Sequence, residues 1–276
     1  MAERAAPGGF LAAMAAASRQ RAEALRGREA ELHARLADLP RAPRLEHDAR
    51  FDLVAEFKRR APSAGVLAGD GDDPARRAAA YAQGGAAAIS VLTEPARFSG
   101  SLDDLAAVAR SATVPAMRKD FLVDPVQLSE ARLAGAAGAL VVVAIVDDGI
   151  LAALDERARE LEMFLLLEAF DERDLDRIEA LLEASGRRDR LVGVNARDLR
   201  DLSVDPGRLA RLAGRARASG VPAVAESGLS GPEDAARVAA LGYRFALVGS
   251  ALMREADPAA LVRAMLAAGR AAAETR

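Results

Sequence analysis

The segment ALVVVAIV (residues 139–146) is followed by a longer polar stretch and then by a second apolar run, MFLLLEA (residues 163–169). Both runs are almost continuously apolar, which is typical of a strand that is covered on both faces in a parallel sheet. Asp147 stands at the start of the stretch between them, a position where aspartate commonly caps a helix. The segment therefore predicts a strand, a helix and a second strand parallel to the first.

The same unit recurs along the chain from residue 50 onward. The apolar runs lie at residues 51–57, 86–92, 114–117, 139–146, 163–169, 191–194, 222–225 and 245–248. Asp-Pro pairs, a common helix start, open four of the intervening stretches, at residues 73, 124, 205 and 257. Eight strand–helix units at a spacing of roughly 30 residues predict an α/β fold, a (β/α)8 TIM barrel. A doubly wound open sheet is disfavoured, because the first run lacks the glycine-rich loop that usually follows it in that fold.

Residues 1–50 precede the repeat. We expect one or two helices over residues 9–36 and a proline-containing link at residues 39–43, which together plug the bottom face or an edge of the barrel. The prediction is one domain, 1–276, with a helical extension at 1–50 and the barrel at 51–276. No apolar run approaches the ~20 residues that span a bilayer. The apolar stretch near the N-terminus continues into an amphipathic helix, so we expect no signal peptide and a cytoplasmic location.

The composition excludes several kinds of chemistry. The 276 residues include no cysteine, so disulfides, cysteine-ligated metals and a cysteine nucleophile are ruled out. The net charge of −3 gives no sign of a nucleic-acid surface. Among 38 basic residues only Lys58 and Lys119 are lysines, and Asn195 is the only asparagine. Since an amine can shed a proton and a guanidinium effectively cannot, the two lysines are candidates for a chemical role.

All three of these rare residues follow predicted strands, where the active sites of (β/α)8 barrels are built. Residues two apart on a strand point the same way, so Glu56 and Lys58 share a side. By the same parity Lys119 points inward and Arg118 outward. Glu168 ends the fifth apolar run, and Arg197 follows Asn195 by two positions. We therefore expect these side chains to meet in one site.

The last two strand ends predict a phosphate cradle. Glu226-Ser227-Gly228 and Gly249-Ser250 are turns that expose backbone N–H groups, and barrels frequently bind phosphate after their seventh and eighth strands. The site has no histidine and no cluster with metal-ligand spacing, so acid–base work falls on lysine and glutamate. A lysine among positive neighbours in a dry pocket can have its pKa lowered and act as a general acid. A Schiff base is the alternative use of such a lysine.

Taken together, the strand ends resemble the indole-3-glycerol phosphate synthase family over nearly the whole chain. The matching pieces are AEFKRRAPS (55–63), ISVLTE (89–94) with Phe98, RKDF (118–121), LE (167–168), GVNARDL (193–199), AESG (225–228) and VGSALMR (248–254). The resemblance implies a (β/α)8 barrel with an N-terminal helical segment. It also implies conversion of 1-(2-carboxyphenylamino)-1-deoxyribulose 5-phosphate to indole-3-glycerol phosphate, CO2 and water, without a cofactor, in tryptophan biosynthesis.

The resemblance also implies roles for single residues. Lys119 is the general acid that protonates the ketose carbonyl oxygen. Glu168 and Glu56 remove protons and stabilise an iminium-like intermediate. Lys58 is a second acid in the dehydration, or a clamp on the substrate carboxylate and phosphate. Asn195 orients the substrate.

The remaining implied contacts surround the substrate. The substrate-binding positions are Arg197, Glu226, Ser63, Pro62, Phe98, Phe121, Leu140 and Leu199, and the phosphate-binding positions are Ser227, Gly228, Gly249 and Ser250. The implied partner is a small phosphorylated substrate. Nucleic acid and membrane are not expected as partners, and the protein is expected to be a monomer or a weak homo-oligomer.

Two positions depart from the family pattern. Ala61 replaces a usual serine and removes a hydroxyl near the phosphate or carboxylate, whereas Ala196 replaces a usual asparagine at a position that parity turns away from the interior. Three other functions are alternatives to this activity. Phosphoribosylanthranilate isomerase chemistry needs the cysteine that this chain lacks. A Schiff-base aldolase would use Lys119, and a non-catalytic sugar-phosphate-binding paralogue has only Ala61 in its support.

Overall fold

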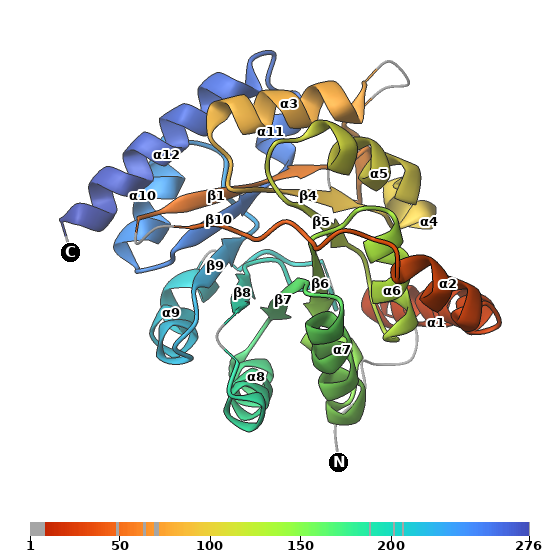
Figure 1. The fold of residues 1–276 in the computed structure, drawn as a ribbon. Helices are drawn as coiled ribbons and strands as arrows, with labels where there is room; N and C mark the ends of the chain where they lie inside the picture. Colours follow the sequence, from red (N-terminus) through yellow and green to blue (C-terminus); the bar gives the residue numbers. More distant parts are fainter. Residues whose placement is uncertain are drawn as a thin grey trace.

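The computed structural model describes residues 9–47, 50–62, 65–68, 72–187, 189–200, 202–205 and 207–275. Within these residues eight parallel strands close into a barrel in the order β1-β10-β9-β8-β7-β6-β5-β4 (Figure 1). The strands are β1 (Asp52–Phe57), β4 (Ala88–Leu92), β5 (Ala116–Lys119), β6 (Gly138–Val142), β7 (Phe164–Ala169), β8 (Arg190–Asn195), β9 (Ala223–Glu226) and β10 (Phe245–Val248). The predicted (β/α)8 barrel is confirmed.

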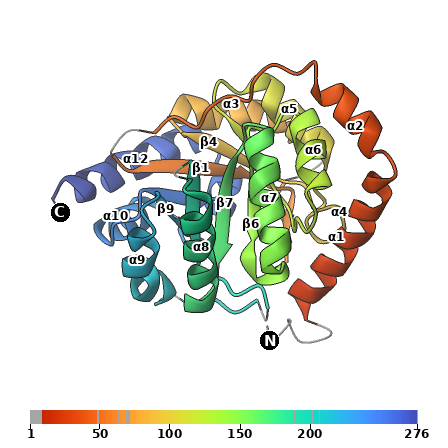
Figure 2. The same cartoon turned by 60° about the horizontal axis from the view of Figure 1, so that its bottom comes forward.

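Helices surround the barrel in Figures 1 and 2. They are α3 (Pro74–Gly84), α5 (Leu102–Ser111), α6 (Val126–Leu133), α7 (Asp148–Glu160), α8 (Glu172–Ser185), α9 (Arg208–Ala218), α10 (Pro232–Ala240) and α12 (Pro258–Glu274). Asp73, Asp147 and Asp257, three of the predicted helix starts, each accept a hydrogen bond from a backbone N–H of the following helix, and Ser101 and Asp171 cap α5 and α8 in the same way. In the described part of the chain, no helix is both long enough and apolar enough to cross a membrane.

Some boundaries differ from the expected ones. The third strand was expected at 114–117, but β5 continues to Lys119, so this lysine is part of the barrel wall. The fourth ends at Val142 instead of 146, because the chain turns into the 3-10 helix η1 (Val143–Ile145), whose apolar side chains pack against the helices. Four short elements were not predicted: the hairpin of β2 (Arg60–Ala61) and β3 (Gly65–Val66), and the helices α4 (Pro95–Phe98) and α11 (Ser250–Arg254).

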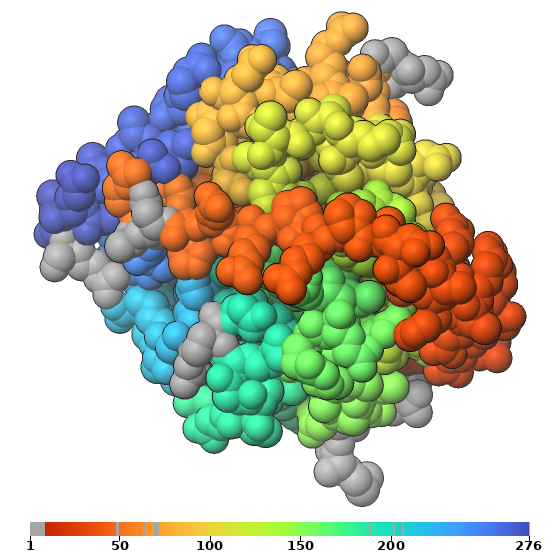
Figure 3. Space-filling view, viewed as in Figure 1, coloured from red at the N-terminus to blue at the C-terminus, as the bar shows by residue number. Residues whose placement is uncertain are grey.

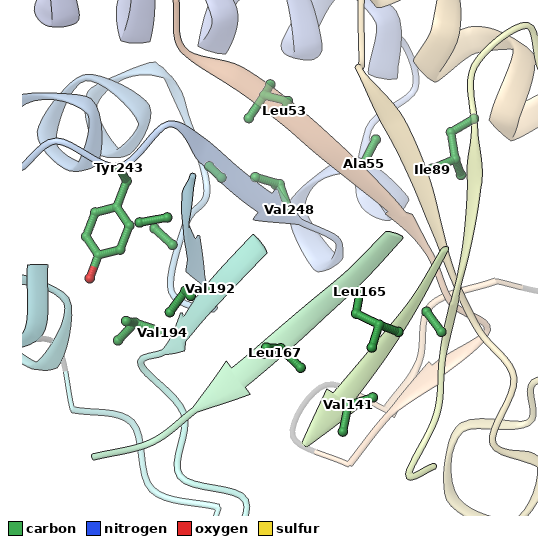
Figure 4. Close-up of a cluster of buried hydrophobic side chains, with 14 of the residues drawn as sticks. Leu53, Ala55, Ile89, Val141, Leu165, Leu167, Val192, Val194, Tyr243 and Val248 are labelled. Carbon is green, nitrogen blue, oxygen red and sulfur yellow. The ribbon is translucent and has the colours of Figure 1, made fainter. Parts of the chain in front are cut away.

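The apolar strands serve two cores at once. Alternate residues such as Leu53, Leu165 and Leu167 point outward and pack under the helices, an arrangement shown in Figure 4. Their neighbours, such as Val54 and Leu166, fill the barrel interior. Both faces of each strand are therefore buried, which explains why the runs lack polar alternation. Polar side chains are accommodated where the strands end.

The N-terminal helices lie along the side of the barrel. Helices α1 (Phe10–Arg26) and α2 (Glu29–Leu36) both contact α6, and Figure 2 shows them beside it. Ser18 Oγ accepts a hydrogen bond from Gln127 Nε2 of α6 at 2.9 Å. Arg21 pairs with Asp120 just beyond β5, with 2.8 Å between Nη2 and Oδ1. These contacts attach the extension to the rim of the barrel.

The link after α2 covers the end of the barrel where the strands begin, opposite the rim where Arg21 pairs with Asp120. In Figures 1 and 3 the orange stretch before β1 crosses this end. The ring of His47 stands edge-on to Phe245, the first residue of β10, with 5.5 Å between the ring centroids. Leu45 packs on the interior core. The expected plug of the bottom face is thus formed by the link, whereas the helices take the side. His47 and His33 are both exposed, so neither histidine of the chain reaches the barrel interior.

A buried ion pair closes the lower part of the wall. Arg190, at the start of β8, is fully buried, and its Nε donates to Asp155 Oδ1 of α7 at 2.6 Å. The same guanidinium also donates to the carbonyls of Met163 and Asp155. Removing one partner of such a pair leaves an uncompensated charge in a dry environment.

We predict that Asp155→Ala lowers the free energy of unfolding by about 3–5 kcal/mol, because Arg190 then stays buried without its carboxylate. Urea unfolding followed by circular dichroism measures the change. Asp189→Ala is the matched control, since Asp189 approaches the same guanidinium at 3.3 Å but is 62% exposed. Equal effects of the two substitutions would show that burial of the pair does not matter.

Candidate active site

A cavity of about 320 Å³ lies at the carboxyl ends of the strands. Its wall contains the predicted site residues that the structure describes. They are Glu56, Lys58, Pro62, Phe98, Lys119, Phe121, Leu140, Glu168, Asn195, Arg197, Leu199, Glu226, Ser227, Gly228, Gly249 and Ser250. Ser63 lies outside the described residues. The sequence reasoning missed further lining residues, among them Leu92, Leu229 and Leu247, since nothing in a continuous apolar run shows which residue reaches the mouth.

Two ammonium groups and three carboxylates form the polar floor of the cavity. Lys58 Nζ lies 2.6 Å from Glu56 Oε1. Lys119 Nζ lies 3.3 Å from Glu168 Oε2 and 3.1 Å from Glu226 Oε2. The three glutamates are almost completely buried, with at most 2% of any of them exposed. Glu56 and Lys58 both belong to the end of β1, whereas Lys119 of β5 pairs with Glu168 of β7 and Glu226 of β9, so closure of the barrel assembles this part of the cluster.

The neighbours of Lys119 are carboxylates, which corrects the expectation of positive neighbours and a lowered pKa. Burial by itself lowers the pKa of Lys119, but the charges of Glu226, Glu168 and Glu56 together outweigh it and raise the pKa. Lys119 is therefore protonated at neutral pH. A protonated lysine can act as a general acid and donate its proton to an oxygen that becomes strongly basic during a reaction.

The carboxylates respond in opposite ways to the same environment. Burial raises the pKa of Glu226 to about 8, and the nearby Glu168 adds to the shift although Lys119 opposes it. Burial also acts to raise the pKa of Glu56, but Lys58 and Lys119 more than compensate and lower it. Carboxyl groups whose pKa values are driven apart in this way are typical of acid–base sites.

Two glycines, which have no side chain, provide the space that the carboxylates occupy. Gly193 in β8 lies opposite Glu168 of β7, and a Cβ added to it would lie 2.1 Å from Glu226 Oε1 of β9. A Cβ on Gly249 would lie 2.3 Å from Glu56 Oε1 and 2.9 Å from Lys58 Nζ. Gly249 was expected only as part of a phosphate cradle. The structure adds a steric reason for a glycine at this position.

One side of the cavity is an apolar wall. Phe98 and Phe121 face each other with 6.2 Å between ring centroids. Phe98 is held by Glu94, whose carboxylate accepts the backbone N–H groups of α4. Phe10 of α1 stands edge-on to both rings, at 6.3 and 6.1 Å. The sequence reasoning did not include Phe10 among the site residues; its signal is that it is the only Phe, Tyr or Trp in residues 1–50.

A second charge network lies behind Lys119, on the outer side of the wall. Arg118 Nη1 donates to Glu130 Oε2 of α6 at 2.8 Å, and its Nη2 donates to Asp120 Oδ2 at 3.0 Å. Burial acts to raise the pKa of Asp120, but Arg118 and Arg21 more than compensate and lower it. Arg118 and Lys119 thus point to opposite sides of β5, as parity predicts.

The backbone after β9 and β10 forms the opposite corner of the cavity. Ser227 and Gly228 both have positive φ, 67° and 70°, so the chain turns sharply where β9 ends. Ser250 begins the short helix α11, directly after Gly249. Barrels commonly bind a phosphate at this place, between the loops after the last two strands and the start of a short extra helix. Nearby, Asn195 Oδ1 accepts the backbone N–H of Arg197 at 2.9 Å.

Fold and site together define the class of the protein, a (β/α)8-barrel enzyme with a lysine–glutamate acid–base centre. The sequence model of the family described as indole-3-glycerol phosphate synthase matches residues 12–265, and the chain belongs to this family. Proteins of that name from Nocardioides sp., Parafrankia sp. and Mycobacterium sp. (strain KMS) are 47%, 46% and 45% identical to it. The matches cover 86%, 80% and 79% of this chain, and 89%, 79% and 77% of the respective relatives.

The raised pKa of Glu226 predicts a pH-dependent stability. Between its ordinary value of 4.5 and about 8, the folded protein keeps a proton that the unfolded chain has lost. Stability from this group is therefore full below pH 4.5 and decreases as pH rises, by on the order of 1 kcal/mol for each pH unit in the window. We expect Glu226→Gln, which stays neutral, to gain stability relative to the wild type between pH 5.5 and 8.5.

Urea unfolding at several pH values measures this difference, and all other titrating groups are common to both proteins. Glu233→Gln, an exposed carboxylate in the first turn of α10, is the control and should run parallel to the wild type. Parallel curves for Glu226→Gln as well would mean that Glu226 titrates normally in the folded protein.

Proposed function

We propose that the lysine–glutamate site converts 1-(2-carboxyphenylamino)-1-deoxyribulose 5-phosphate to indole-3-glycerol phosphate, CO2 and water, and that its own side chains do so without a cofactor. The protein is accordingly a carboxy-lyase of tryptophan biosynthesis. The observation that supports this most strongly is the position of Lys119, which lies between Glu168 and Glu226 in the cavity that the aromatic wall also lines.

Ring closure is the first step. The ring carbon that carries the substrate carboxylate attacks the ketose carbonyl carbon, and Lys119 Nζ gives a proton to the carbonyl oxygen. The new carbon–carbon bond leaves an iminium-like nitrogen, which Glu56 and Glu168 stabilise by their negative charge. Phe98, Phe121, Leu140 and Leu199 hold the aromatic ring over the carbonyl, and orientation of this kind is a large part of catalysis.

Decarboxylation and dehydration complete the reaction. The carbon–carboxylate bond breaks, CO2 leaves, and the released electron pair restores the aromatic ring and neutralises the nitrogen. The hydroxyl then takes a proton and leaves as water. Glu168 removes a proton from the carbon next to the nitrogen, which forms the double bond of the indole. Asn195 and Arg197 orient the sugar chain beside these groups.

The phosphate is held at the opposite corner. Ser227, Gly228, Gly249 and Ser250 line the cavity at the ends of β9 and β10, where turned backbone and a helix start favour an anion. Lys58 lies close enough to this corner to contact a substrate phosphate or carboxylate, since it would overlap a Cβ on Gly249. Ala61 also lines the cavity, so the hydroxyl it lacks is missing from the wall itself.

The raised pKa of Lys119 argues against the Schiff-base alternative. A lysine that attacks a carbonyl must be a neutral amine, which requires a lowered pKa. Here the carboxylates keep the ammonium protonated. A proton donor fits this environment and a nucleophile does not.

We also infer one domain over residues 1–276, supported by the contacts of α1 with α6 and Asp120. We infer further that the protein is a monomer or a weak homo-oligomer and that it acts in the cytoplasm. The location follows from the substrate, because a phosphorylated anion does not cross a bilayer unaided.

We predict that Lys119→Arg lowers kcat for indole formation by about 100- to 10,000-fold, because a guanidinium keeps the charge but cannot release its proton. Lys58→Arg and Glu168→Gln should also lose most activity. Indole fluorescence after addition of the carboxyphenylamino-deoxyribulose phosphate measures the rate. Arg211→Lys, at a site that is 57% exposed, is the matched control and should be unchanged. Normal turnover in both lysine variants would refute the assignment of the acids.

We predict that Gly193→Ala lowers the same rate by about 100-fold while the protein stays folded, because the added methyl displaces the Glu226 carboxylate. Gly214→Ala in α9 is the control, since a Cβ there has no neighbour within 4 Å among the described residues. The comparison uses indole fluorescence together with thermal unfolding. An active Gly193→Ala protein would show that the position of Glu226 is not critical.

A further inference from the structure

The two carboxylates beside Lys119 have more hydrogen-bond acceptor oxygens than there are donors near them. Lys119 Nζ approaches Glu168 Oε2 and Glu226 Oε2. The Oε1 atoms of both side chains are buried, and neither has a hydrogen-bond partner in the part of the chain that the structure describes. An ionised carboxylate only accepts hydrogen bonds, so two neighbouring ones cannot satisfy each other. One proton placed between them removes the conflict.

The charges around the cavity also favour one extra proton. Glu226 on β9 faces Lys119 of β5 and Glu168 of β7, with Glu56 and Lys58 of β1 across the floor. Arg197 follows β8 and, among the described residues, makes no ion pair with these glutamates; its Nη1 donates to the carbonyl of Leu202 at 3.2 Å, away from the floor. Asp120 follows β5, where Arg118 and Arg21 neutralise it. Three glutamates therefore face two lysines in the floor, and a single proton balances this cluster. Glu56 is committed to Lys58 at 2.6 Å, which leaves the Glu168–Glu226 pair as its place.

The proposed reaction needs such a proton. Ring closure consumes one proton at the carbonyl oxygen, and departure of the hydroxyl as water consumes a second. Loss of CO2 from a carboxylate releases none, and formation of the indole double bond returns one, to the base. Each turnover thus needs two donated protons, whereas the ammonium of Lys119 can give only one before it is reloaded.

We propose that Glu226 holds a proton, shared with Glu168, and reloads Lys119 with it between ring closure and dehydration. After Lys119 has protonated the carbonyl oxygen, its neutral amine lies 3.1 Å from Glu226 Oε2. Rotation of the Glu226 carboxyl group about its Cγ–Cδ bond brings the protonated oxygen to this position, and the amine takes the proton. The restored ammonium then protonates the leaving hydroxyl, and the now fully ionised Glu168 accepts the proton from carbon. One proton from solvent and the one on Glu168 restore the starting state. This role rests on the function proposed above.

Glu226→Gln tests the reload. Glutamine is neutral, as the protonated carboxyl is, but it cannot give up a proton. With a substrate labelled in its carboxylate, rapid-quench measurement should show CO2 released in the first turnover, while indole forms at least about 100-fold more slowly than in the wild type. KM should change by less than about threefold, because the contacts to substrate are kept. The wild-type kcat should fall as pH rises through about 8, and Glu226→Gln should lack this limb.

Each other outcome has a definite meaning. If CO2 and indole appear together in Glu226→Gln at the wild-type rate, Glu226 supplies no proton and Lys58 is the second acid. If both fall together with a large rise in KM, Glu226 only binds substrate, and the reload is equally refuted. If the wild type forms no indole at all, the proposed function itself fails. Glu233→Gln is the control for a carboxylate outside the cavity.

Infrared spectroscopy detects the proposed carboxyl proton directly in the wild-type protein, without turnover. The wild type should show the carbonyl band of a protonated carboxylic acid at pH 7, and the band should vanish by pH 9.5. Asp174 contributes little there, since burial raises its pKa only to about 6. Absence of the band at pH 7 overturns the proposal, and its loss in Glu226→Gln assigns it.

Discussion

The ammonium group of Lys119, held between Glu168 and Glu226, is the interaction on which the site depends. Its three members come from β5, β7 and β9, strands far apart in the sequence, so the contact exists only in the closed barrel. Burial makes the interaction strong and also makes any unbalanced charge costly. The proton state of the lysine and the proton state of the carboxylates are consequently set together.

The same strands meet two opposite requirements along their length. Apart from Arg190 and Asp52 at strand starts, their lower and middle parts carry mainly apolar side chains on both faces, which fill the barrel and pack against the helices. Their upper ends carry the charged groups on the inward face and, at β5, Arg118 on the outward face. Because successive side chains of a strand point to opposite faces, the charge network of Arg118 lies outside the barrel and that of Lys119 lies inside it. The outer network stabilises the end of β5, which carries Lys119.

The sequence was sufficient for the fold because burial on both faces leaves a continuous apolar run wherever a strand occurs. It was sufficient for most of the cavity wall because Lys58, Lys119 and Asn195 are rare in this chain and stand at strand ends. The sequence was insufficient to predict which charges surround Lys119, because its partners Glu168 and Glu226 lie 49 and 107 residues away. Phe10 was missed for a related reason, since its contact with Phe98 depends on how α1 docks.

Gly193 has a further consequence for how such a sequence can change over time. It lies between two strands, opposite Glu168 and within overlap distance of the carboxylate of Glu226. A larger residue there would overlap the Glu226 carboxylate, so the position stays closed to other residues for as long as Glu226 keeps its place. A glycine with no chemistry of its own thus limits which substitutions β8 can accept.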